Sequence, residues 1–89
     1  MIERELLVTN RLGLHARATA RLVQLLSAYR CNVTLAAKGR EVNAKSIMGV
    51  MLLAAGPGTS IVLRVDGADE AAAADAVTDL FARNFHEGS

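Results

Sequence analysis

The spacing of hydrophobic and polar residues changes several times along the chain, and each change predicts a different element. Residues 2–8 carry β-compatible apolar residues with charges among them, which is typical of a strand. From residue 16 onward the less polar residues recur at the spacing of one helix face, at Thr19, Leu22, Val23 and Leu26. Residues 32–42 alternate again about Lys38-Gly39, a dipeptide typical of a tight turn, and predict a hairpin.

The second half of the chain predicts a short helix, a strand and a last helix. Ser46 is a residue type that caps helices, and the apolar run after it ends at Gly56-Pro57-Gly58. Residues 60–65 alternate as a strand, and Asp66-Gly67 is a turn dipeptide that ends it. The acidic pair Asp69-Glu70 suits the start of a helix. The inner stripe of this last helix is predicted to hold Ala73, Val77, Leu80, Phe81 and Phe85.

The order of these elements, βαββαβα, predicts the fold class. The hairpin forces at least one antiparallel strand pair, so the sheet is expected to be antiparallel or mixed, with helices backing one face. A chain of 89 residues suffices for one domain that buries about 60 to 65% of its unfolded surface. Because no repeat and no Gly/Ser/Pro linker divides the chain, residues 1–89 are predicted to form a single domain.

Composition and charge narrow the class of partner. The formal net charge is +1 and the aromatic residues are one tyrosine and two phenylalanines, so nucleic acid is not an expected partner. The longest apolar run, residues 47–55, is about half of a bilayer span, so no membrane insertion is expected. Residues 1–10 carry charges that a secretory signal lacks, and the lone Cys31 fits a reducing compartment. We therefore expect a cytoplasmic protein.

The segment Gly13-Leu14-His15-Ala16-Arg17 puts an imidazole at the cap of the first predicted helix and a guanidinium in its first turn. Unpaired backbone N–H groups and the helix dipole attract an anion to such a start, and Arg17 can add a charged fork. The same field opposes imidazolium formation, so we expect a neutral His15 ring at pH 7, with a lone pair able to attack phosphorus. Spacing alone leaves open a plain capping role for His15 and a solvated Arg17.

Gly-Leu-His-Ala-Arg at 13–17 and Lys-Ser-Ile-Met-Gly-Val-Met at 45–51 stand in register, and together they resemble the HPr family of histidine phosphocarriers of the bacterial phosphotransferase system. The resemblance covers nearly the whole chain. It implies an α+β open-faced β-sandwich, in which three helices cover one face of a four-stranded antiparallel sheet. It also implies that His15 accepts a phosphoryl group on Nδ1 from Enzyme I and passes it to an enzyme IIA. Arg17 and the backbone amides of Ala16 and Arg17 would hold the phosphate. A monomer without cofactor or metal is expected.

The docking surface for these partners is predicted on the starts of the first two helices. Methionine is adaptable at surfaces that meet several partners, although Met48 and Met51 also fit a plain core role. The family's docking face favours exposure. The predicted surface consists of Ala16, Ala20, Arg21, Gln24, Ile47, Met48 and Met51.

Ser46 has two roles that do not exclude each other. As a helix N-cap, its loss would cost about 1 kcal/mol. The family resemblance also implies that HPr kinase/phosphorylase, in some bacteria, phosphorylates this serine. The added charge would lie beside the docking surface and weaken partner binding.

Four points stay open or depart from the family pattern. Ala18 stands where the family commonly has proline, so the entry to the helix is expected to be slightly less rigid. His86 has no Cys or His at ligand spacing, so we interpret it as a frayed, solvated end and not as a metal ligand. A non-phosphorylated regulatory or ligand-binding α+β domain is the alternative function. The sugar-type and nitrogen-type (NPr) branches are not distinguished.

Overall fold

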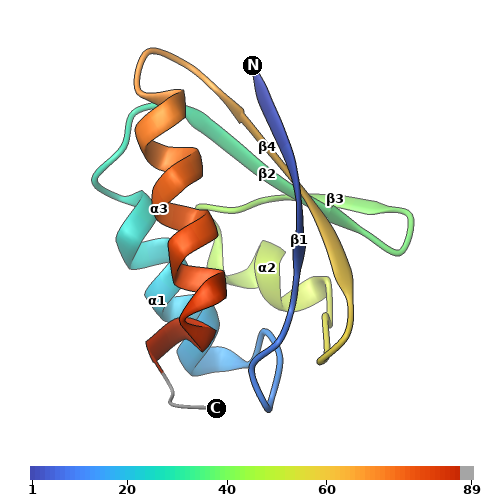
Figure 1. Cartoon of the computed structure of the whole chain (residues 1–89). Coiled ribbons are helices and arrows are strands. Elements are labelled where there is room, and N and C mark those ends of the chain that lie inside the picture. The colour runs from blue at the N-terminus through green and yellow to red at the C-terminus, as the bar shows by residue number, and fades with distance from the viewer. Residues whose placement is uncertain (87–89) are drawn as a thin grey trace.

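The computed structural model describes residues 1–86, which form a four-stranded sheet covered on one face by three α-helices (Figure 1). The α+β fold class and the element order predicted from the sequence are confirmed. The elements are β1 (Ile2–Leu7), α1 (Ala16–Leu26), β2 (Asn32–Ala37), β3 (Arg40–Asn43), α2 (Ile47–Leu52), β4 (Ser60–Asp66), α3 (Glu70–Ala82) and a 3-10 turn, η1 (Asn84–His86).

The sheet is antiparallel throughout, with strand order β1-β4-β2-β3. β4 lies in the interior of the sheet because its inner face is wholly apolar. Ile61, Leu63 and Val65 are fully buried beneath the helices. Val62 and Arg64, which alternate with them, lie on the uncovered face. The turn between β2 and β3 has positive φ at both Lys38 and Gly39, as a two-residue hairpin requires.

The core lies between the sheet and the helices. α1 buries Leu22 and Leu26 completely, and full burial of a leucine stabilises the fold by about 1.5 to 3 kcal/mol. The spacing predicted Val23 on the inner face of α1, but Val23 is only half-buried. Ala18 is buried instead. The reason is geometric: residues four apart, such as 18, 22 and 26, stack on one helix face, whereas position 23 is rotated away.

The end of the chain differs from the prediction. α3 ends at Ala82, and Phe85 enters the core through a left-handed turn and not as part of the helix stripe. Its ring is fully buried and packs on Phe81 with 4.8 Å between the ring centroids. His86 belongs to this turn and its backbone N–H donates to the Arg83 carbonyl at 3.0 Å. The interpretation of His86 as a frayed end is therefore wrong.

Candidate functional site

The loop before α1 is held against the loop that joins α2 to β4. Asn10 is fully buried, and its side-chain amide donates to the Gly13 carbonyl at 2.7 Å. Gly13 has φ +68°, and a Cβ there would lie 2.4 Å from the Ala55 carbonyl oxygen. The next residue, Leu14, is buried and its N–H donates to that same oxygen at 2.8 Å. These contacts define where the chain enters α1.

His15 is the N-cap of α1. Its backbone is extended, with φ −77° and ψ −179°, and its Nδ1 accepts a hydrogen bond from the Arg17 backbone N–H at 3.3 Å. Accepting that bond requires an unprotonated Nδ1, because only a lone pair can receive a donor. The same lone pair is the one that a phosphorus electrophile would meet. The imidazole therefore presents a nucleophilic nitrogen at the positive end of a helix.

A cationic pocket of about 640 Å³ surrounds this nitrogen. Its lining residues come from the loop before α1, from the first turns of α1 and from η1. Three arginines bring permanent positive charge to one hollow, which suits an anion such as a phosphoryl group. The lining residues are Arg11, Leu12, His15, Ala16, Arg17, Arg21 and His86.

The sequence prediction for this pocket was partial. It named His15, Ala16, Arg17 and Arg21, and all of these line the same hollow. Arg11, Leu12 and His86 were not predicted as site residues. Arg11 and Leu12 lie in a loop without periodicity, and nothing local to His86 indicates that α3 and η1 return it to the start of α1.

The predicted docking residues lie on two helices that contact each other, α1 and α2, and all but the half-buried Arg21 are exposed. Ala20 and Gln24 are exposed on α1. On α2, Met48 is 78% exposed, and Met51 is 41% exposed, so neither methionine is core. Ile47 is 50% exposed. Two further apolar side chains that were not predicted, Leu12 and Leu52, are also exposed.

Ser46 is the N-cap of α2, as predicted. Its hydroxyl oxygen accepts a hydrogen bond from the Gly49 backbone N–H at 3.1 Å. The residue is half-buried, at the edge of the exposed apolar face of α2. The hydroxyl therefore stabilises the start of a helix of six residues that has few other hydrogen bonds of its own.

Comparison with known proteins decides the family. Residues 2–83 match the family model described as the PTS HPr component phosphorylation site. The chain belongs to the HPr family. Phosphocarrier protein HPr of Xylella fastidiosa (strain 9a5c) is 63% identical to it over 87 residues, which cover 98% of each chain. The function of this HPr-family chain is therefore that of a phosphocarrier of the phosphotransferase system, and the alternative of a non-phosphorylated module is excluded.

Solved HPr structures have the same fold. The crystal structure of HPr-C-His from Thermoanaerobacter tengcongensis matches with a TM-score of 0.94 and 38% identity, over 98% of each chain. A crystal structure of an HPr dimer from the same organism matches with a TM-score of 0.77 and 38% identity, over 96% of this chain and 98% of that one. The predicted open-faced HPr-like fold is confirmed.

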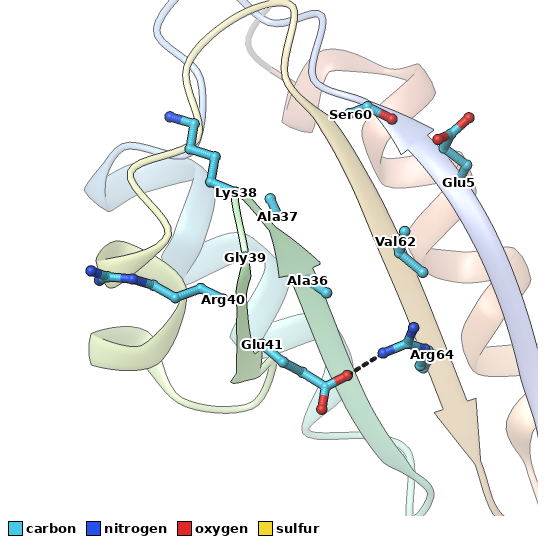
Figure 2. Close-up of a pocket in the computed structure, with 10 residues that line it drawn as sticks. All are labelled: Glu5, Ala36, Ala37, Lys38, Gly39, Arg40, Glu41, Ser60, Val62 and Arg64. Carbon is cyan, nitrogen blue, oxygen red and sulfur yellow. Dashed lines mark hydrogen bonds and ion pairs between the residues drawn. The ribbon is translucent and has the colours of Figure 1, made fainter.

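The uncovered face of the sheet carries a second, shallower hollow of about 520 Å³ (Figure 2). Charges of both signs line it, and Arg64 forms ion pairs with Glu41 and, at 2.7 Å, with Glu3. These pairs satisfy the guanidinium and raise the pKa of Arg64. Neither His15 nor Arg17 lines this hollow, so it is separate from the cationic pocket at the start of α1.

Other side chains of chemical interest are not arranged for reaction. Cys31 is buried, and this burial together with the neighbouring Asp69 raises the pKa of its thiol, which disfavours the reactive thiolate. Within residues 1–86, no three His, Cys, Asp or Glu side chains gather as a metal site. None of the helices in these residues combines the length and apolar character needed to cross a membrane.

Proposed function

We propose that His15 is the residue on which this phosphocarrier is phosphorylated, with Enzyme I as the donor and an enzyme IIA as the acceptor. The observation that supports this is the hydrogen bond from the Arg17 N–H to His15 Nδ1 at the start of α1. Because Nδ1 accepts this bond, its lone pair is directed at the backbone N–H groups of the helix start, in a pocket that Arg17 also lines. A half-buried histidine that lines a cationic pocket at the surface suits a carrier, because two other proteins must reach it in turn.

The proposed transfer is an in-line displacement at phosphorus. The Nδ1 lone pair forms the new N–P bond while the bond from phosphorus to the donor breaks, and the donor keeps that electron pair. Once Nδ1 carries the phosphoryl group it no longer accepts from the Arg17 amide. The backbone amides of Ala16 and Arg17 then become donors for phosphoryl oxygens, and the Arg17 guanidinium adds a charged, bidentate contact. Transfer to the IIA component reverses these steps.

Incubation with Enzyme I and phosphoenolpyruvate, followed by intact mass, tests the assignment. The parent should gain one phosphoryl group that acid removes, as expected for a phosphohistidine. A His15→Ala variant should gain none. Ser60→Ala is the matched control, because Ser60 is exposed on the far sheet face and should be phosphorylated like the parent. Acid-labile phosphate on His15→Ala would contradict the proposal.

The apolar face of α2 and the exposed face of α1 are proposed as the surface on which Enzyme I and the IIA component dock. It comprises the predicted residues Ala16, Ala20, Arg21, Gln24, Ile47, Met48 and Met51, to which the exposure of Leu12 and Leu52 adds two. Exposed large apolar side chains grouped beside a reactive residue are typical of interaction sites.

Ser46 is proposed as a regulatory site for HPr kinase/phosphorylase. A phosphate there would add a charge of about −1.5 to −2 next to the apolar face of α2, where it would oppose docking. The fold would tolerate it, because the charge would lie at a helix N-terminus. A Ser46→Asp variant should accept phosphate from Enzyme I more slowly than the parent, at unchanged thermal stability. Equal rates would count against this regulatory role.

We also propose that the protein works in the cytoplasm. A cytoplasmic location is supported by the unpaired, buried Cys31, because a lone thiol fits a reducing compartment. We propose that the monomer is the working form, since the docking surface must be open to two partners. Light scattering during size-exclusion chromatography, on the parent and on its phosphorylated form, tests this.

A further inference from the structure

The last turn of the described chain has an unusual backbone. Asn84, Phe85 and His86 have φ values of 53°, 57° and 61°, so three consecutive residues other than glycine lie in the left-handed region. This conformation is costly for residues with a Cβ, and it persists only where surrounding contacts hold it. Contacts with other parts of the fold must therefore hold residues 84–86 in this conformation.

Three contacts hold this turn. The fully buried Phe85 ring packs on Phe81 in the core. The Thr9 hydroxyl donates to Asn84 Oδ1, which ties the turn to the loop after β1. The guanidinium of Arg21, one helical turn beyond Arg17 on α1, donates to the Phe85 carbonyl. The turn is thus fixed to the helix whose N-cap is His15.

The consequence is the position of His86. Fixed in this way, His86 lines the same cationic pocket as His15 and Arg17. An imidazole carries at least one ring N–H in either protonation state, so it can donate to an anion in this pocket. Arg21, by contrast, has its guanidinium engaged with the Phe85 carbonyl and acts through the turn that it holds.

We propose that His86 is a phosphate-contacting residue of this carrier and that Arg21 is its positioning residue. In the phosphorylated form, a ring N–H of His86 donates to an oxygen of the phosphoryl group on His15. The turn 84–86 places His86, and with it this donor, in the wall of the pocket. This inference rests on the proposed function, because it requires the phosphoryl group to be on His15.

The test measures the phosphorylation equilibrium. Catalytic amounts of Enzyme I are mixed with the chain at fixed ratios of phosphoenolpyruvate to pyruvate, and the phosphorylated fraction is read by intact mass. At equilibrium this fraction depends only on the relative free energies of the phosphorylated and free forms. Any change in Enzyme I docking cancels, so the readout reports on contacts to the phosphoryl group.

Loss of a charge-assisted hydrogen bond at a partly exposed site should destabilise the phosphorylated form moderately. His86→Ala should shift the equilibrium constant toward the unphosphorylated form by roughly three- to tenfold. His86→Gln keeps an N–H donor and should stay within about twofold of the parent. Arg21→Ala should resemble His86→Ala. Arg83→Ala is the matched control, because Arg83 precedes the same turn but pairs with Asp79 outside the pocket; its equilibrium should equal the parent's.

The outcomes separate this inference from the proposed function. If the parent gains no acid-labile phosphate, or gains it elsewhere than on His15, the proposed function fails and this inference fails with it. If the parent is phosphorylated on His15 and His86→Ala has the parent's equilibrium constant, only the role of His86 is overturned. An unchanged constant in Arg21→Ala, with a shifted one in His86→Ala, would overturn the positioning role of Arg21.

Discussion

At the scale of single residues, the placement of His15 depends on Gly13. One residue, Leu14, separates them, and its hydrogen bond to Ala55 depends on a close approach that only glycine allows. The positive φ of Gly13 turns the chain so that the His15 backbone reaches its extended N-cap conformation. A change at Gly13 therefore acts on the site without touching any atom of the imidazole.

Gly13→Ala should destabilise the protein by about 1 to 3 kcal/mol, because the new Cβ meets backbone atoms and the φ becomes strained. Urea unfolding followed by circular dichroism measures the loss. Gly39→Ala is the matched control: its φ is also positive, but nothing lies within 4 Å of the new Cβ. It should lose less than Gly13→Ala, and equal losses would contradict the steric account.

At the scale of elements, the start of α3 is fixed to the loop before β2. The Asp69 carboxylate accepts hydrogen bonds from the backbone N–H groups of Arg30, at 2.8 Å, and Cys31, at 3.0 Å. These donors hold the pKa of Asp69 below its usual value of 3.8. Asp69, the N-cap residue of α3, thus uses its side chain between elements and not to cap its own helix.

Asp69→Asn should make stability less sensitive to acid. Because the folded-state pKa lies below the unfolded value, the contribution of Asp69 is fully present above about pH 5 and declines as the pH falls through the folded pKa. The urea midpoints of parent and variant should therefore differ most at pH 7 and converge below pH 4. A difference of the same size at pH 7 and pH 3 would contradict this role of the charge.

At the scale of the whole molecule, the two faces are built for different tasks. The helix side carries the cationic pocket and the exposed apolar residues of α2. The open sheet face has Arg64 paired with acidic side chains, and Figure 2 shows its pair with Glu41. Satisfied charges on the open face offer little to a partner, while apolar side chains gain from being covered. Docking is therefore expected on the helix side.

Met48→Lys should raise the KM for phosphorylation by Enzyme I by roughly tenfold, while the melting temperature stays near that of the parent, because a 78% exposed side chain adds little to the core. Leu7→Lys is the matched control: it adds the same charge at a side chain that is 54% exposed on the open face, away from the pocket. An equal rise in KM for both variants would contradict docking on α2.

The sequence alone determined much of the fold and the centre of the site. Period-two and helical spacing identified every strand and the three helices, because burial on one face leaves its period in the chain. The N-caps His15 and Ser46 were likewise predictable, since capping depends on residues only two or three positions away. The hydrogen bond between Arg17 and His15, on which the proposed phosphate site rests, is local in the same sense.

The tertiary structure decided what joins distant segments. Antiparallel order throughout the sheet follows from β4 pairing with both β1 and β2, which no local pattern specifies. The left-handed turn at 84–86 exists because a buried Phe85 and the Arg21 guanidinium hold it, and the contact with Arg21 joins residues 64 positions apart. His86 lines the pocket of His15 for the same reason. The spacing of residue types along the chain reflects contacts between near neighbours, whereas contacts between distant residues depend on how the elements pack.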